Sequence, residues 1–172
     1  MKARILGVVL GLAGFALSAI ASGEQHVPAA SDQAAHHACF AQEQQALERG
    51  EGFGMALAAD RHGFPGPKHI LELRERLELT PGQEEQVRRL FDRMQTRALE
   101  VGKQVLEREA ELERLFASGS VDPLALQLLL NDIASLRAEL RWVHLAAHLE
   151  ARELLTSEQR ARYQAFRHPS PP

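Results

Sequence analysis

The sequence has one cysteine, Cys39, among its 172 residues. A single cysteine cannot form a disulfide bond within the chain, so Cys39 is predicted to be a free thiol, one half of an intermolecular bridge or a metal ligand. The stability of the fold must therefore come from helix packing or from association with a second copy.

Positive charge and catalytic motifs are also scarce. The chain has 20 lysines and arginines against 23 aspartates and glutamates, a formal net charge of −3. Because binding to a nucleic-acid backbone depends on clustered positive charge, nucleic acid is not an expected partner. The sequence contains no Gly-x-Ser-x-Gly motif, no glycine-rich phosphate loop and no His-Glu-x-x-His motif. We therefore expect neither an enzyme nor an organic cofactor.

A short apolar run opens the chain. Lys2 and Arg4 precede an apolar stretch over residues 5–20, and Ala19 and Ala21 have the spacing of a cleavage site. The run is too short for a stable membrane span, so it predicts a secretory signal peptide cleaved near Ala21. An uncleaved membrane anchor is the alternative.

Composition divides the chain into four parts. Residues 1–21 are the predicted signal peptide, and residues 22–40 form a flexible leader without hydrophobic periodicity. Residues 41–168 are long enough for a single helical domain, and residues 169–172 form a tail.

The leader carries a small group of candidate metal ligands, His36, His37 and Cys39. Thiol and imidazole groups suit borderline or soft cations such as zinc and copper. The three residues therefore form a candidate metal site. The alternative is a flexible tail that happens to contain them.

Two long amphipathic helices dominate the rest of the chain. Thr80 is a favourable N-cap, Pro81 is tolerated at the first helical position, and Gln83 can reach back to the cap. Asp122 and Pro123 open the second long helix in the same way. In both helices apolar residues recur at alternating spacings of three and four, which predicts a long antiparallel hairpin. The two seams are Val87, Phe91, Met94, Ala98, Val101, Val105, Arg108, Leu112 and Leu115, and Leu126, Leu129, Ile133, Leu136, Leu140, Val143, Ala147, Glu150 and Leu154.

Shorter helices are predicted at 41–49, 54–59, 68–77 and 157–167, and no strand pattern occurs. The expected fold class is therefore all-α, a long antiparallel helical hairpin with shorter flanking helices. His69, at the start of one short helix, is expected to be a surface group, with a role as an additional ligand as the alternative.

A pair of histidines on the second long helix is the main candidate site. His144 and His148 are one helical turn apart, so their rings share a face and can hold one metal ion. Each lies one residue past a seam position, which predicts a partly exposed flank. Glu150 or the leader cluster could supply further ligands to zinc or copper. The alternative is that both histidines are ordinary polar flank residues.

The pattern Leu-Thr-x-x-Gln occurs twice. Leu79–Gln83 opens the first long helix, and Leu155–Gln159 opens the last short helix. In each copy the threonine can cap the helix and the glutamine can reach back to the cap N–H. The predicted structural caps are Thr80, Gln83, Thr156 and Gln159.

Two such motifs, each opening a helix in a chain with a signal peptide, resemble the Spy and CpxP family of periplasmic proteins. Its relatives include the zinc-responsive ZraP and heavy-metal sensors such as CnrX. The resemblance covers about Phe53 to Phe166, and the segments 52–55 and 63–69 are similar to the metal-resistance branch. It implies a hooked helical hairpin that dimerises into a curved cradle. It also implies ATP-independent holdase activity in some members and metal sensing in others.

These observations together predict a periplasmic metal-binding stress protein that senses or buffers zinc-type or copper-type ions in metal resistance. The alternatives are a holdase chaperone for unfolded clients and an adaptor that represses a membrane-bound sensor kinase. A homodimer is expected because one hairpin cannot cover all of its apolar residues outside the seams. Those residues are Leu90, Leu99, Leu106, Phe116, Leu124, Leu128 and Leu145.

Overall fold

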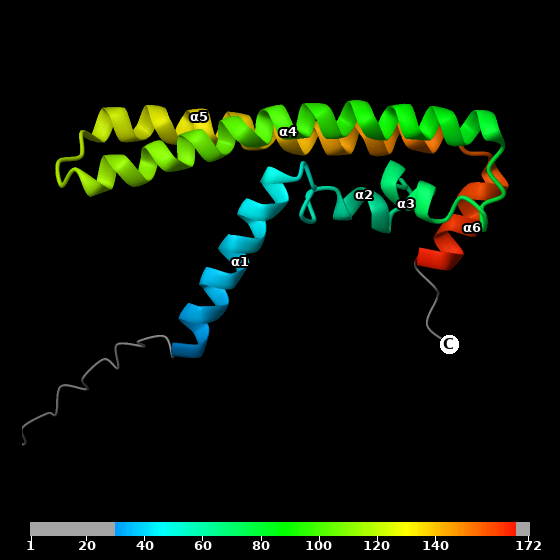
Figure 1. Cartoon of the computed structure of the whole chain (residues 1–172), viewed down its shortest axis with the longest axis horizontal. Helices are drawn as coiled ribbons and strands as arrows, with labels where there is room; N and C mark the ends of the chain where they lie inside the picture. Colours follow the sequence, from blue (N-terminus) through cyan, green and yellow to red (C-terminus); the bar gives the residue numbers. More distant parts are fainter. Residues whose placement is uncertain (1–29, 168–172) are drawn as a thin grey trace, which may run out of the picture.

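The computed structural model describes residues 30–167, and within them all regular secondary structure is helical (Figure 1). The helices are α1 (Ala30–Glu48), α2 (Leu57–Arg61), α3 (Pro67–Glu72), α4 (Pro81–Ala117), α5 (Pro123–Glu153) and α6 (Ser157–Arg167). The predicted all-α fold is confirmed. The predicted signal peptide and the predicted tail lie outside the described residues. None of the described helices is long and apolar enough to cross a membrane.

Helices α4 and α5 form the long antiparallel hairpin that the two seams predict (Figure 1). Thr80 begins α4 with a capping box, in which the Gln83 N–H donates to Thr80 Oγ1 over 3.2 Å and the Thr80 N–H donates to Gln83 Oε1 over 3.1 Å. Asp122 begins α5 by accepting from the N–H groups of Leu124 and Ala125. These caps pair backbone donors that the first turn of a helix leaves free, so both helices begin where the sequence predicts.

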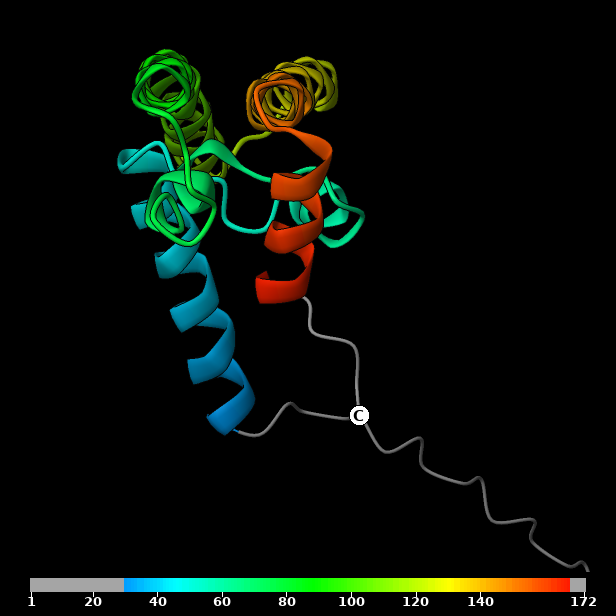
Figure 2. The ribbon, with the colours of Figure 1, turned by 90° about the vertical axis from the view of Figure 1, so that its right-hand side faces the viewer.

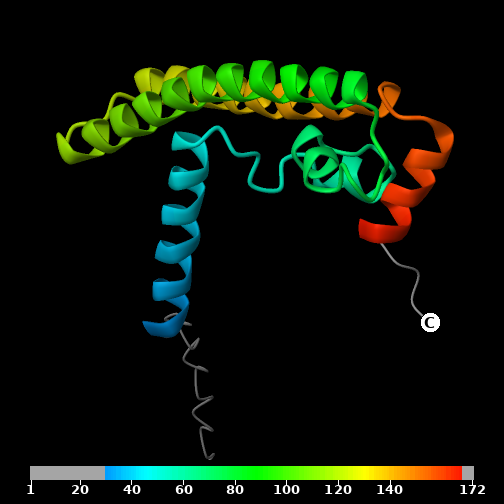
Figure 3. The same cartoon turned by 45° about the vertical axis from the view of Figure 1, so that its right-hand side comes forward.

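The remaining helices lie on one side of the hairpin (Figures 2 and 3). Helices α2 and α3 run along that side, α6 folds back beside them as a hook, and α1 projects away at a steep angle (Figure 1). The end of α1 packs on α4 at Gly102, where an added Cβ atom would lie 2.8 Å from the Leu47 carbonyl oxygen. Glycine at position 102 therefore allows the two backbones to approach.

Three helix boundaries differ from the prediction. Helix α1 begins at Ala30, so the second half of the predicted leader is helical. Its alanines favour the helix even though the stretch has no apolar periodicity, because alanine has the highest helix propensity. Helix α2 begins at Leu57, after Gly54 with a φ of 76°, and α3 ends at Glu72, where turns replace the predicted last part of the helix.

The apolar core has two clusters, one near the hook and one near the end of α1. The first comprises Ile70, Leu77, Val87, Leu90, Ala147, Ala151, Leu155 and Tyr163, and the second comprises Leu47, Ala98, Val101, Val105 and Leu140. The prediction that a second copy covers Leu90 is wrong. Helix α3 packs against α4, and the Leu90 side chain is buried in the first cluster. Leu106 likewise packs against the second cluster.

The two Leu-Thr-x-x-Gln motifs contact each other. At the second motif the Thr156 N–H donates to Gln159 Oε1 over 3.0 Å, and the Gln159 N–H donates to Thr156 Oγ1 over 3.2 Å. The side-chain amides of Gln83 and Gln159 exchange two further hydrogen bonds, of 2.9 and 3.1 Å. Gln159 Nε2 also donates to the Leu77 carbonyl, and Gln83 Nε2 donates to the Leu154 carbonyl. The paired glutamines thus fasten the start of α6 to the start of α4.

Candidate metal centre

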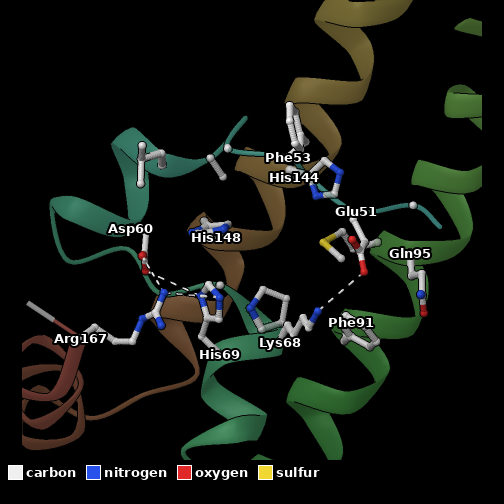
Figure 4. Close-up of a pocket in the computed structure, with 18 residues that line it drawn as sticks. Glu51, Phe53, Asp60, Lys68, His69, Phe91, Gln95, His144, His148 and Arg167 are labelled. Carbon is white, nitrogen blue, oxygen red and sulfur yellow. Dashed lines mark hydrogen bonds and ion pairs between the residues drawn. The ribbon is translucent and has the colours of Figure 1, made fainter. Parts of the chain in front are cut away.

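A cavity of about 350 Å³ lies between the hairpin and the segment that carries α2 and α3 (Figure 4). Residues 50–54, 56–57, 60 and 66–69 form one wall, and side chains of α4 and α5 form the other. Arg167, at the end of α6, closes the cavity at the hook. Three histidines, His69, His144 and His148, line this one space.

His144 and His148 are buried in the cavity wall, with 5% and 8% of their surface exposed. This corrects the predicted partly exposed flank. The hairpin alone would leave the pair on its flank, but the segment with α2 and α3 covers that side of α5. Gly52 lies against the His144 ring, and Gly66 lies against the His148 ring. The two histidines therefore share a face of α5, as predicted. The segment that lies over both rings, which we call the cover, is not indicated by the sequence pattern.

One carbonyl oxygen orients the His148 ring. The Nδ1 atom of His148 lies 2.7 Å from the carbonyl oxygen of Phe64. A carbonyl oxygen can only accept, so Nδ1 carries a proton and donates it, and in the neutral ring the lone pair is on Nε2. Histidines that bind metals commonly donate their second nitrogen to a carbonyl in this way. His148 is therefore held in the tautomer that can ligate through Nε2.

His144 has a buried nitrogen without a partner. Among the described residues no group forms a hydrogen bond with His144 Nε2. Burial, with a smaller contribution from His148, lowers the pKa of His144 below its usual value of 6.5, so the ring is neutral at pH 7. A buried polar atom without a partner costs about 1–3 kcal/mol, and such atoms often mark a ligand site. The arrangement suits a cation that accepts an imidazole lone pair.

Further potential ligands line the same cavity. They are Glu51, Asp60, His69 and Met94. The His69 side chain, expected at the surface, is 32% exposed and also lines the cavity. Among the described residues no three His, Cys, Asp or Glu side chains lie close enough to hold a metal ion as they stand. A third ligand would therefore have to move toward the histidine pair.

Two other predicted ligands, Glu150 and Cys39, do not line the cavity. Glu150 is exposed and pairs with Arg93 of α4 over 2.6 Å, so it is not the third ligand that the sequence suggests. Cys39 is exposed on α1 and does not line the cavity. The side chains of His36 and His37 lie outside the described part of the structure.

A buried polar cluster at the hook joins α2, α3 and α6. The Tyr163 hydroxyl donates to Asp60 Oδ1 over 2.5 Å, and Arg167 Nη2 donates to Asp60 Oδ2 over 3.4 Å. Burial alone would raise the pKa of Asp60, but Tyr163, Arg167 and His69 outweigh it and hold that pKa below its usual range. Sequence reasoning misses this cluster because Asp60 and Tyr163 are 103 residues apart.

A family model described as heavy-metal resistance matches residues 6–162. The chain belongs to the heavy-metal resistance family. The match covers the hairpin, both Leu-Thr-x-x-Gln motifs and the histidine pair, which confirms the resemblance to the metal-resistance branch. No curated protein and no solved structure matches the chain significantly. Membership assigns this chain a role in heavy-metal resistance, and the buried imidazoles of His144 and His148 fit a metal ion.

The pKa of His144 predicts how the metal-free stability of this family member depends on pH. The unfolded chain takes up a proton at His144 near pH 6.5, whereas the folded chain resists it to lower pH. The free energy of unfolding should therefore fall below pH 6.5, by at most about 1.4 kcal/mol per pH unit for this group. Burial also lowers the pKa of His69, so this group likewise makes the free energy of unfolding fall as the pH drops below 6.5.

The pH dependence of stability is measured as the thermal midpoint of unfolding between pH 7.5 and pH 5, with a chelator present to keep the protein metal-free. The His144→Leu variant cannot take up the proton, so its midpoint should fall less steeply than that of the wild type. Replacing the exposed His62 by glutamine should leave the slope unchanged. An equally steep fall in His144→Leu would contradict the assignment.

Proposed function

We propose that this protein binds a zinc-type or copper-type ion in the cavity, through His144 and His148, and senses or buffers that ion in the periplasm. The observation that carries the proposal is the histidine pair itself. Both rings are buried, Phe64 orients one of them, and the other has an Nε2 atom without a partner among the described residues. Imidazole nitrogen is a preferred ligand of zinc and copper.

The cover over the pair favours sensing over simple storage. A Cβ atom at Gly66 would lie 2.8 Å from His148 Nε2, the atom proposed to bind the metal. An ion at that nitrogen needs room that the segment around Gly66 now occupies, so metal binding has to shift the cover. A bound ion thereby changes the surface that the protein presents to a partner, such as a membrane-bound sensor.

Calorimetric titration of the mature protein with Zn(II) and with Cu(II) tests the proposal. The double change His144→Ala, His148→Ala should abolish the tightest site, because it removes both proposed ligands. His62→Ala is the matched control, since His62 is exposed and does not line the cavity. Wild-type affinity in the double variant would leave the pair as ordinary buried histidines and would refute the proposal.

A holdase chaperone is the second candidate, and exposed apolar side chains near the turn between α4 and α5 favour it. Phe116, Leu124 and Leu128 are 58%, 64% and 58% exposed. Monomeric soluble proteins rarely expose large contiguous apolar patches. A holdase would protect an unrelated unfolding protein at low molar ratio without added metal, and Leu124→Lys with Leu128→Lys would remove that protection. Metal-dependent assembly without protection would favour sensing.

We also propose a homodimer in which α5 of one copy packs antiparallel on α5 of the other. Along its outer face, apolar residues lie at spacings of three and four on either side of a centre formed by the exposed Asn131, Ser135 and Ala138. They are Leu124, Leu128, Trp142, Leu145 and Leu149. In an antiparallel pair, Leu124 and Leu128 of one copy face Trp142, Leu145 and Leu149 of the other, so apolar side chains meet at both ends of the interface, as in a coiled coil.

Trp142→Glu should convert such a dimer into a monomer, because the change places a charge in the proposed interface. Sedimentation velocity at micromolar concentration measures the outcome. Gln104→Glu adds the same charge on the exposed face of α4 and should leave the dimer intact. A wild-type monomer would leave the stripe open as a surface for client proteins.

A further inference from the structure

The cavity already contains a cation, the guanidinium of Arg167. Arg167 Nη2 lies 3.4 Å from Asp60 Oδ2 and 3.5 Å from His69 Nε2, at the hook end of the cavity (Figure 4). The side chain of Asp60 is only 8% exposed. The last residue of α6 therefore places a positive charge between a carboxylate and an imidazole, two groups that commonly bind zinc.

The hydrogen bonds assign a tautomer to His69. A guanidinium has only donors, so the contact with Arg167 requires an unprotonated His69 Nε2 with its lone pair toward the arginine. The proton is then on Nδ1, which lies 3.5 Å from the Tyr163 hydroxyl and 4.0 Å from Asp60 Oδ1. Arg167 thus occupies the one lone pair with which a neutral His69 could bind a metal.

His69 is well placed to move. Its three contacts of 3.5 to 4.0 Å are long for hydrogen bonds, whereas Tyr163 and Asp60 are joined at 2.5 Å. His69 therefore loses little when it leaves the cluster. It lines the same cavity as His148, which lies between His69 and His144 in Figure 4.

We propose that Arg167 is a built-in competitor of the metal ion. A divalent cation bound by His144 and His148 recruits His69 as its third ligand, displaces the guanidinium, and so loosens the end of α6. This rests on the proposed function of the histidine pair. Two cations in one partly buried cavity repel each other, so the ion and Arg167 exclude one another. Metal occupancy is thereby transmitted to the last described helix of the chain.

The first test compares Zn(II) affinity in two variants that remove the same charge from the same helix. Arg167→Gln should bind Zn(II) at least about five-fold more tightly than the wild type, the lower end of typical coupling between sites. Arg162→Gln should bind like the wild type, because Arg162 pairs with Glu78 and does not line the cavity. Unchanged or weaker binding by Arg167→Gln would overturn the proposal.

The second test reads the displacement directly, by hydrogen exchange of residues 157–167 with and without Zn(II). In the wild type Zn(II) should speed exchange in the last turn of α6. In His69→Ala it should bind more weakly and leave that exchange unchanged. Slower or unchanged exchange in the wild type, or full affinity in His69→Ala, would refute the recruitment of His69.

The two tests distinguish a failure of the proposed metal site from a failure of Arg167 as its competitor. If the wild type does not bind Zn(II), or binds it without His144 and His148, the proposed function itself is wrong. If binding needs the pair but is indifferent to Arg167 and His69, only the competitor is wrong. Glu51, which is 48% exposed and pairs loosely with Lys68, would then be the ligand to test next.

Discussion

Replacing Gln159 by alanine is expected to lower the free energy of unfolding by about 2–4 kcal/mol. The side chain is 7% exposed and makes hydrogen bonds to Thr156, Gln83, Leu77 and Glu78. Losing one hydrogen bond costs about 1 kcal/mol, and leaving a buried carbonyl unpaired costs a further 1–3 kcal/mol. The three bonds donated by Nε2 share two amide hydrogens and belong to one network, so the contributions of the individual bonds do not add. Thr156→Ala removes one capping bond, so it should cost only about 1 kcal/mol.

Urea denaturation of the metal-free protein measures both effects. Gln104→Ala is the matched control, because the Gln104 side chain is exposed and donates its hydrogen bond to the Glu100 carbonyl on its own helix. It should stay within about 0.5 kcal/mol of the wild type. A double-mutant cycle of Gln83 and Gln159 should show a coupling of about 0.5–3 kcal/mol. Strictly additive losses would mean that the paired amides do not act together.

Gly66→Ala is expected to disturb both the fold and the metal site. The added Cβ would lie 2.8 Å from His148 Nε2 and 3.0 Å from Cε1. The ring cannot move aside without losing its 2.7 Å bond to the Phe64 carbonyl. The backbone at Gly66, with φ −78° and ψ 146°, suits alanine, so the loss comes from the collision alone. Overpacking of this kind typically costs about 1–3 kcal/mol.

The same collision falls on the nitrogen proposed to bind the metal, so Zn(II) affinity should fall by roughly tenfold or more, as for changes to groups that orient ligands. Gly52→Ala should have a smaller effect, because its Cβ would stop 3.2 Å from His144 Nδ1. Gly82→Ala is the control. The Cβ added at position 82 would point into open space in the first turn of α4. Because alanine has a higher helix propensity than glycine, the variant should be more stable by up to about 1 kcal/mol. A Gly66→Ala variant as stable as Gly82→Ala would contradict the close contact.

The hairpin and its ends could be predicted because their signals are local. The capping residues Thr80 and Asp122 lie next to the helices they begin, and each apolar seam repeats within one helix. The spacing of His144 and His148 likewise places them on one helical face whatever surrounds them. The start of α1 was harder to predict, because alanine-rich composition favours a helix without marking its first residue.

The sequence by itself determined the two long helices, their hairpin and the two histidines one turn apart, since the signals for these features lie within a few residues of one another. Only the tertiary structure decided that the pair is buried, because its cover comes from residues 50–69. The same holds for the Gln83–Gln159 pair, whose members lie 76 residues apart, and for Asp60, which lies 103 residues from Tyr163 and 107 from Arg167. The physical reason is that these contacts form only where the segment before α4 and the hook after α5 fold back onto the same side of the hairpin. The spacing of residues within one helix does not predict which distant segments come together in this way.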